Sequence, residues 1–164
     1  MSVFNINGVS VTINEGSASP MQVEQLTRSL QLLPRIHLAR LPEISVVTTH
    51  GYRGGSSRNP TSPDGGSIHI SSLCFSSAWN QGAYNQTLLH ECGHIIDWTY
   101  HCTTYLRQHD RAGYDALLGH AHSGRTQGAG EHFADAYKDY FIGRIDSARR
   151  NALLHSPAFV GLGN

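Results

Sequence analysis

The residues from 88 to 98, LLHECGHIIDW, contain the side chains with the clearest capacity for chemistry. On an α-helix, residues four positions apart lie on one face, so His90 and His94 would present two imidazoles to one metal ion. Glu91 would stand beside them, where a carboxylate can take a proton from a metal-activated water. The chain has 11 histidines, so two surface histidines at this spacing by chance are the alternative.

A catalytic zinc site needs a third protein ligand and leaves its fourth position to water. A metzincin would have a histidine at position 100, but this chain has Tyr100. His101 lies roughly 10 Å further along a helix than His94, which is too far to share the ion. The sequence therefore excludes the metzincin arrangement.

A second segment, GEHFADAYKDYF at residues 130–141, contains the candidate third ligand. The pattern HExGHxxD, followed about forty residues later by ExFADAY, resembles the zincin peptidases with a glutamate ligand, especially the anthrax lethal factor and Pro-Pro endopeptidase group. This resemblance covers residues 87–143 and implies that His90, His94 and Glu131 hold Zn²⁺. The alternative for Glu131 is an acid that complements the dipole at a helix N-terminus.

The resemblance also implies two supporting carboxylates. Asp135 corresponds to the residue that hydrogen-bonds the first histidine ligand, here His90. Such a bond fixes the tautomer and the orientation of the imidazole. Asp97 matches the aspartate that follows HExGH in this group, and we expect it to support the site as well.

The chain departs from the lethal-factor group at the oxyanion-stabilising residue. That group has a tyrosine seven residues before the glutamate ligand, where this chain has Gly124. His122 occupies the offset at which thermolysin-like enzymes carry a tyrosine, so we predict it as the donor, with Tyr114 and His120 as alternatives. Each of these could instead be an ordinary loop or surface residue.

Hydrophobic patterning predicts the elements that position these residues. Ser19 as N-cap, Pro20 and Gln22 predict the start of an amphipathic helix. Alternating residues predict strands, and a 3.6-residue period predicts further helices. The predicted strands are 8–13, 43–50 and 67–71, and the later helices are 84–101, 103–119 and, as the final helix, 131–145.

The segment 51–66, GYRGGSSRNPTSPDGG, is too rich in glycine, proline and serine for regular structure, and we predict a long loop there. We expect residues 65–71 to form the edge strand of the cleft. A small sheet followed mostly by helices predicts an α+β fold. With the resemblance, this indicates one zincin-like domain over residues 1–164: a small N-terminal twisted sheet with an edge strand over the cleft, an active-site helix and C-terminal helices.

Composition excludes several classes of function. Lys+Arg and Asp+Glu both number 12, so no net field attracts nucleic acid or an anionic membrane, and we interpret Arg149 and Arg150 as a solvated helix end. No apolar run approaches the roughly 20 residues of a membrane span. The three cysteines, Cys74, Cys92 and Cys102, have no CxxC spacing and are expected to be buried thiols. The first residues do not resemble a signal peptide, which predicts a cytoplasmic protein as synthesised, with export by a signal-independent route left open.

The sequence thus predicts a zinc-dependent endopeptidase that acts on a protein or peptide substrate. One alternative is a pseudo-peptidase that binds zinc and serves as a binding module. A further hypothesis is a toxin or effector delivered into other cells, with an inhibitor or immunity protein as its partner.

Overall fold

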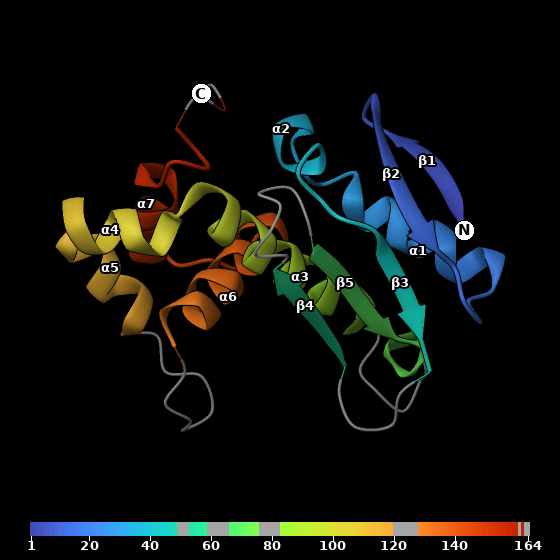
Figure 1. Ribbon diagram of the computed structural model, residues 1–164. Coiled ribbons are helices and arrows are strands. Elements are labelled where there is room, and N and C mark those ends of the chain that lie inside the picture. Colours follow the sequence, from blue (N-terminus) through green and yellow to red (C-terminus); the bar gives the residue numbers. More distant parts are fainter. Residues whose placement is uncertain (49–52, 59–65, 76–82, 120–127, 161, 163–164) are drawn as a thin grey trace.

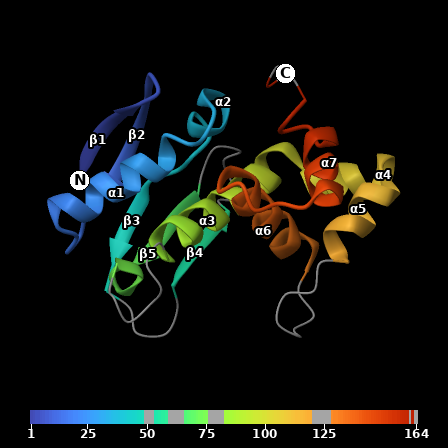
Figure 2. The same cartoon turned by 180° about the vertical axis from the view of Figure 1, so that it is seen from behind.

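The computed structural model describes residues 1–48, 53–58, 66–75, 83–119, 128–160 and 162 (Figure 1). A β-sheet lies at one end of the molecule and a group of helices at the other, and helix α3 (Ala83–Tyr100) runs between them (Figures 1 and 2). Helix α3 contacts both strand β5 (Gly66–Ser71) and helix α6 (Ala129–Phe141). The predicted α+β class is confirmed.

The sheet has five strands in the order β1-β2-β3-β5-β4. The neighbours β2, β3 and β5 are parallel, and the outer strands β1 and β4 are antiparallel to theirs. The strands other than β5 are β1 (Ser2–Ile6), β2 (Val9–Asn14), β3 (Ile44–Val47) and β4 (Gly54–Arg58). Strands β2, β3 and β5 match the three predicted strands.

The prediction that residues 65–71 form the edge strand was wrong. Strand β5 is interior, and the edge is β4, which lies in the segment predicted as a loop. Its sequence, GGSSR, has low intrinsic strand propensity. Pairing with β5 along all five residues stabilises the strand, and a single-sequence pattern does not register that partner.

Strand β1 was also missed, although the sequence carries a signal for it. Asn7 and Gly8 join β1 to β2 and have positive φ angles of 52° and 81°. An Asn-Gly pair with both φ angles positive is the preferred two-residue connection of a hairpin.

The helices follow their predicted starts more closely than their predicted ends. Helix α1 (Pro20–Leu30) begins with the predicted capping box between Ser19 and Gln22. The predicted helix 103–119 is divided at Asp110, whose side chain caps the second part. The helices beyond α1, α3 and α6 are α2 (Arg35–Leu38), α4 (Cys102–His109), α5 (Arg111–Leu118) and α7 (Ser147–His155), with a short 3₁₀ turn at Ser72–Phe75.

Helices α1 and α3 lie on the same face of the sheet (Figures 1 and 2). The buried side chains of β3 and β5 join those of these helices in one apolar core. Members of this core include Leu26, Leu30, Ile44, Ile68, Ile70, Leu88 and Leu89.

The three cysteines are free and buried, as predicted. No helix in the described ranges is long and apolar enough to cross a membrane.

Arg149 corrects another prediction. Its side chain is only 3% exposed, and its guanidinium pairs with Asp139 at 2.9 Å and with Asp146. Helix α7, which carries it, follows the helix predicted to be final. The carboxylate of Asp139 comes from α6, a contact that the sequence pattern did not indicate, whereas Arg150 is exposed as predicted.

The close approach of α3 and α6 depends on Gly93. A Cβ atom at this position would lie 2.8 Å from Cα of Ala134 and 3.1 Å from Cβ of Tyr137. The backbone of a packed helix cannot move aside as easily as the end of a flexible side chain. Gly93 therefore sets how near the two helices lie.

Replacing Gly93 with alanine should push α3 and α6 apart. Overpacking of this kind costs about 1–3 kcal/mol, so we expect the Gly93→Ala protein to unfold at a lower denaturant concentration. Urea unfolding followed by circular dichroism measures the change. Gly55→Ala is the matched control because a Cβ there meets nothing within 4 Å. Equal stability of the two variants would contradict this account of the helix contact.

His37 is a fully buried histidine that joins three parts of the chain. Its Nε2 lies 2.8 Å from the carbonyl oxygen of Ala158, and its Nδ1 lies 2.9 Å from the hydroxyl of Tyr137. A carbonyl only accepts, so Nε2 donates and Nδ1 accepts from the hydroxyl. Burial lowers the pKa of His37, although the bond to Ala158 opposes this shift.

Because the folded protein keeps His37 neutral, protonation favours the unfolded chain. The ordinary pKa is 6.5, so the unfolding free energy should fall as the pH drops below that value. The side chain introduced in His37→Gln does not titrate, so this pH-dependent contribution to the unfolding free energy is absent. The stability advantage of wild type over the variant should therefore shrink between neutral and mildly acidic pH in paired urea titrations. An advantage that stays constant with pH would show that His37 does not contribute in this way.

Candidate metal centre

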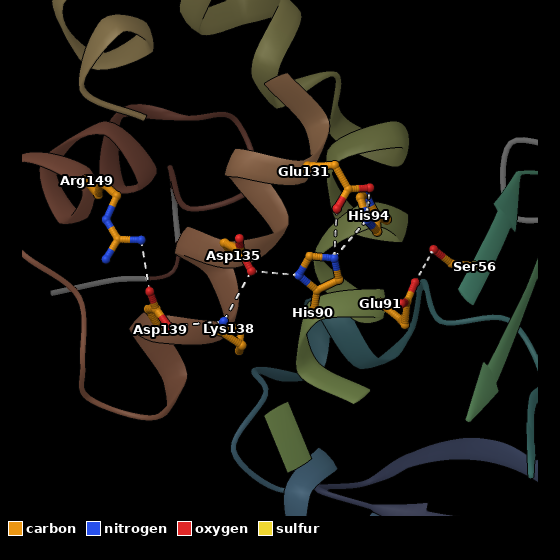
Figure 3. A network of polar contacts seen from close by, with 9 residues as sticks. All are labelled: Ser56, His90, Glu91, His94, Glu131, Asp135, Lys138, Asp139 and Arg149. Carbon is orange, nitrogen blue, oxygen red and sulfur yellow. Dashed lines mark hydrogen bonds and ion pairs between the residues drawn. The ribbon is translucent and has the colours of Figure 1, made fainter. Parts of the chain in front are cut away.

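Two histidines on α3 face the same point. The Nε2 atoms of His90 and His94 are 3.1 Å apart, and their rings are nearly perpendicular (Figure 3). The spacing of four residues places them one turn apart on the helix, as the sequence predicts.

Glu131 lies in the first turn of α6 and completes the group. Its Oε2 is 3.2 Å from Nε2 of His90, and its Oε1 is 3.2 Å from Nε2 of His94. One atom from each of the three residues lies within 4.8 Å of the others. Nitrogen and oxygen atoms this close must share either a hydrogen or a cation, and two imidazoles with a carboxylate are a common ligand set for a metal ion. This group could therefore hold a metal ion.

Asp135 orients the first of the two histidines. Its Oδ1 lies 3.0 Å from Nδ1 of His90, and since a carboxylate only accepts, Nδ1 carries the hydrogen. The neutral ring then presents a bare Nε2 to the group. The same Oδ1 also accepts a hydrogen bond from Nζ of Lys138 at 3.1 Å, so a cation stabilises the carboxylate that orients His90 (Figure 3).

The electrostatics of the three groups follow from these contacts. Burial opposes ionisation of Asp135, but His90 and Lys138 outweigh it and hold the pKa of Asp135 below its ordinary value. Burial also opposes protonation of His90, but the bond to Asp135 and the nearby carboxylates raise its pKa. Burial and the charge of His90 lower the pKa of His94. The site is therefore arranged to keep one imidazole free of a proton.

Glu91 lies beside the group and is only 7% exposed. Its Oε2 accepts a hydrogen bond of 2.8 Å from Oγ of Ser56, on the edge strand β4 (Figure 3). Burial raises the pKa of Glu91, although the bond from Ser56 opposes the shift. Sequence reasoning missed Ser56 because its segment was predicted as a loop.

Trp98 is a second residue that sequence reasoning missed. Its indole stacks on the ring of His94, with centroids 5.6 Å apart and planes inclined by 21°. It comes four residues after His94, a spacing that could have indicated the contact. The stacked ring limits the orientations available to this imidazole.

Asp97 holds the turn between α3 and α4. It accepts hydrogen bonds from the backbone N–H and the hydroxyl of Thr103, at 2.8 and 3.0 Å. A Cβ at Gly130 would lie 3.6 Å from its Oδ2, so Asp97 also borders the first turn of α6. It therefore supports the helix ends around the site.

Of the predicted oxyanion donors, only Tyr114 lies within the described residues, and its described contacts do not include His90, His94 or Glu131. Tyr114 lies on α5 and lines a cavity of about 90 Å³ together with Thr103 and Ala129. Its described ring contact is the guanidinium of Arg111, 5.6 Å from its centroid. His120, His122 and Gly124 lie outside the described residues. The donor stays a prediction.

A larger cavity, of about 490 Å³, lies away from the group, between α1 and the β1–β2 hairpin. Two carboxylates line it, but Glu15 pairs with the N-terminal amine at 3.3 Å and Glu24 pairs with Arg28 at 2.6 Å. Both carboxylates in this cavity are therefore already paired with a cation. The His90–His94–Glu131 group is therefore the candidate site.

Comparison with protein-family models, curated proteins and solved structures finds no match for this chain. The assignment of the site therefore depends on its own geometry.

The group should bind one divalent ion per chain. Loss of the anionic ligand in Glu131→Gln should abolish tight binding, and Asp135→Asn should weaken it by about 10–100-fold, as is usual for a residue behind a ligand. Competition with a chromogenic chelator measures both constants. Asp115→Asn, a change at an exposed carboxylate on α5, is the control. Undiminished affinity in Glu131→Gln would contradict the site.

Proposed function

We propose that the protein is a zinc-dependent endopeptidase with a zincin-like fold. The observation that supports this most strongly is the convergence of His90, His94 and Glu131 beside a second, buried carboxylate, Glu91. This combination supplies ligands for a metal and a separate base at the same place. A purely structural metal site has no need of the base.

The distances are compatible with zinc. Tetrahedral zinc with bonds of about 2.0–2.1 Å places its ligand atoms about 3.3 Å apart. The two Nε2 atoms are separated by 3.1 Å, and the Glu131 oxygens lie 3.2 Å from them. Two imidazoles and one carboxylate form a ligand set found in catalytic zinc sites, which leave a fourth position open.

The open side of the group faces solvent. The side chain of Glu131 is 44% exposed, whereas that of His94 is 11% exposed. A substrate could therefore approach past the α6 side of the group. His94 is the buried member of the group, and His90 is intermediate, with a side chain that is 20% exposed.

The roles of the side chains follow from this arrangement. When bound, a zinc ion would polarise both a water molecule and the scissile carbonyl. Glu91 takes the proton of the attacking water and then passes it to the leaving amine. Burial raises the pKa of Glu91, which makes it a stronger base than an exposed glutamate. Asp135 accepts the Nδ1 hydrogen of His90 and so fixes the neutral tautomer whose Nε2 lone pair faces the group.

An extended peptide is the substrate that suits the adjoining sheet edge. Among the described strands, β4 lies at the edge of the sheet, where it pairs with β5 and contacts α3. The other side of an edge strand can pair with the backbone of a peptide. This supports a protein or peptide substrate that lies along β4 and across the metal group.

A variant of Glu91 tests the proposal. Glu91→Gln should retain zinc and fold, yet its kcat should fall by about 10²–10⁴, because a general base contributes that much. Mass spectrometry of a proteome-derived peptide library measures cleavage, and plasma emission measures zinc. Glu24→Gln, an exposed change on α1, is the control.

Two outcomes would contradict this proposal. Zinc binding without cleavage of any peptide by the wild-type protein would favour a zinc-binding module instead. Undiminished cleavage by Glu91→Gln would show that another group activates the water.

A further inference from the structure

We propose that Ser56, on the edge strand β4, is a positioning residue that holds the carboxylate of Glu91 for proton transfer. This inference rests on the proposed peptidase function for its catalytic meaning. The contact itself is a structural feature, the hydrogen bond of 2.8 Å from Oγ of Ser56 to Oε2 of Glu91 (Figure 3).

The strand and the helix are in register at two points. Gly54 and Ser56 are two residues apart and share one face of β4, which separates them by about 6.7 Å. Thr87 and Glu91 are four residues apart on α3, a rise of about 6 Å. Because the two spacings match, Gly54 lies against Thr87 and Ser56 lies against Glu91.

The first of these points fixes how close the strand lies to the helix. A Cβ at Gly54 would be 2.5 Å from Cγ2 of Thr87 and 2.9 Å from the carbonyl oxygen of His69. Only glycine allows this approach without a shift of the strand. The hydroxyl of Ser56 reaches the carboxylate of Glu91 because Gly54, on the same face of the strand, has no side chain.

At the second contact, between Ser56 and Glu91, one carboxylate oxygen of Glu91 accepts a hydrogen bond. Among the side chains that the structure describes, Ser56 is the donor to this buried carboxylate. A serine hydroxyl donates one hydrogen, so Oε2 is engaged and Oε1 stays available to take a proton. A buried carboxylate without such a donor would turn toward other polar groups, since an unsatisfied buried charge is costly.

The position of Ser56 also links the base to the substrate. The strand proposed to pair with a peptide backbone is the strand that orients Glu91. A peptide bound along β4 would fix Ser56 and, through it, the carboxylate. The effect of Ser56 should therefore fall on kcat rather than on KM.

The neighbouring residue provides a matched control. Ser57 is exposed and its hydroxyl lies 2.7 Å from that of Ser67 on β5, away from α3. Ser56→Ala and Ser57→Ala delete the same atom from adjacent positions of one strand. Only the first deletion removes the contact with Glu91.

The kinetic experiment compares the two zinc-loaded variants with wild type, using the library peptide that wild type cleaves fastest. For Ser56→Ala we expect kcat to fall about tenfold, which corresponds to one hydrogen bond to a charged group. Its KM and zinc content should stay unchanged. Ser57→Ala should behave as wild type. A kcat for Ser56→Ala within twofold of wild type would overturn the proposal.

A second measurement needs no substrate. Crystal structures of the zinc-loaded wild type and both variants should show the Glu91 carboxylate in one orientation in wild type and Ser57→Ala, and displaced in Ser56→Ala. A carboxylate that keeps its place in Ser56→Ala overturns the proposal whatever the kinetics. If wild type cleaves no peptide, the peptidase proposal fails by itself, and the crystal comparison still decides whether Ser56 positions Glu91.

Discussion

The contact between α3 and α6 at Gly93 determines whether a metal centre can exist in this chain. The two histidines come from α3 and the carboxylate from α6, so the separation of the helix axes sets the distance from Glu131 to both imidazoles. A Cβ at Gly93 would lie 2.8 Å from the Ala134 backbone, which shows how little space remains. The glycine inside HECGH thus contributes to the site by having no side chain, although it holds no ligand atom.

The candidate site is supported from two directions. On the ligand side, the imidazole of His90 contacts Asp135, and alternating charges continue from Asp135 through Lys138 and Asp139 to Arg149 on α7 (Figure 3). Buried charges are stable only when each is paired, so removal of one member affects its neighbours. On the base side, Glu91 depends on the sheet through β4. The helices therefore position the proposed ligands, and the sheet edge positions the proposed base and the proposed peptide path.

Sequence reasoning succeeded where the signal was local. The capping box at Ser19, the alternation in β2 and the four-residue spacing of His90 and His94 each involve residues within one turn or one strand. Glu131 and Asp135 came from a resemblance between motifs rather than from any periodicity, and the structure brings both to His90. Strand β1 and Trp98 were missed despite such local signals, whereas two other errors concern partners on other elements. Arg149 was interpreted as solvated because its partner Asp139 lies on another helix, and β4 was missed because its stability comes from β5.

The sequence by itself determined which residues share a face: the two imidazoles on α3, the carboxylates Glu131 and Asp135 on α6, and the apolar stripe of α1. Helical and strand geometry repeat over a few residues, so such relations can be derived without a fold. Only the tertiary structure decided which faces meet. Ser56 is 35 residues from Glu91, and His90 is 45 residues from Asp135. Contacts over such separations depend on the packing of whole elements, and no local pattern encodes them.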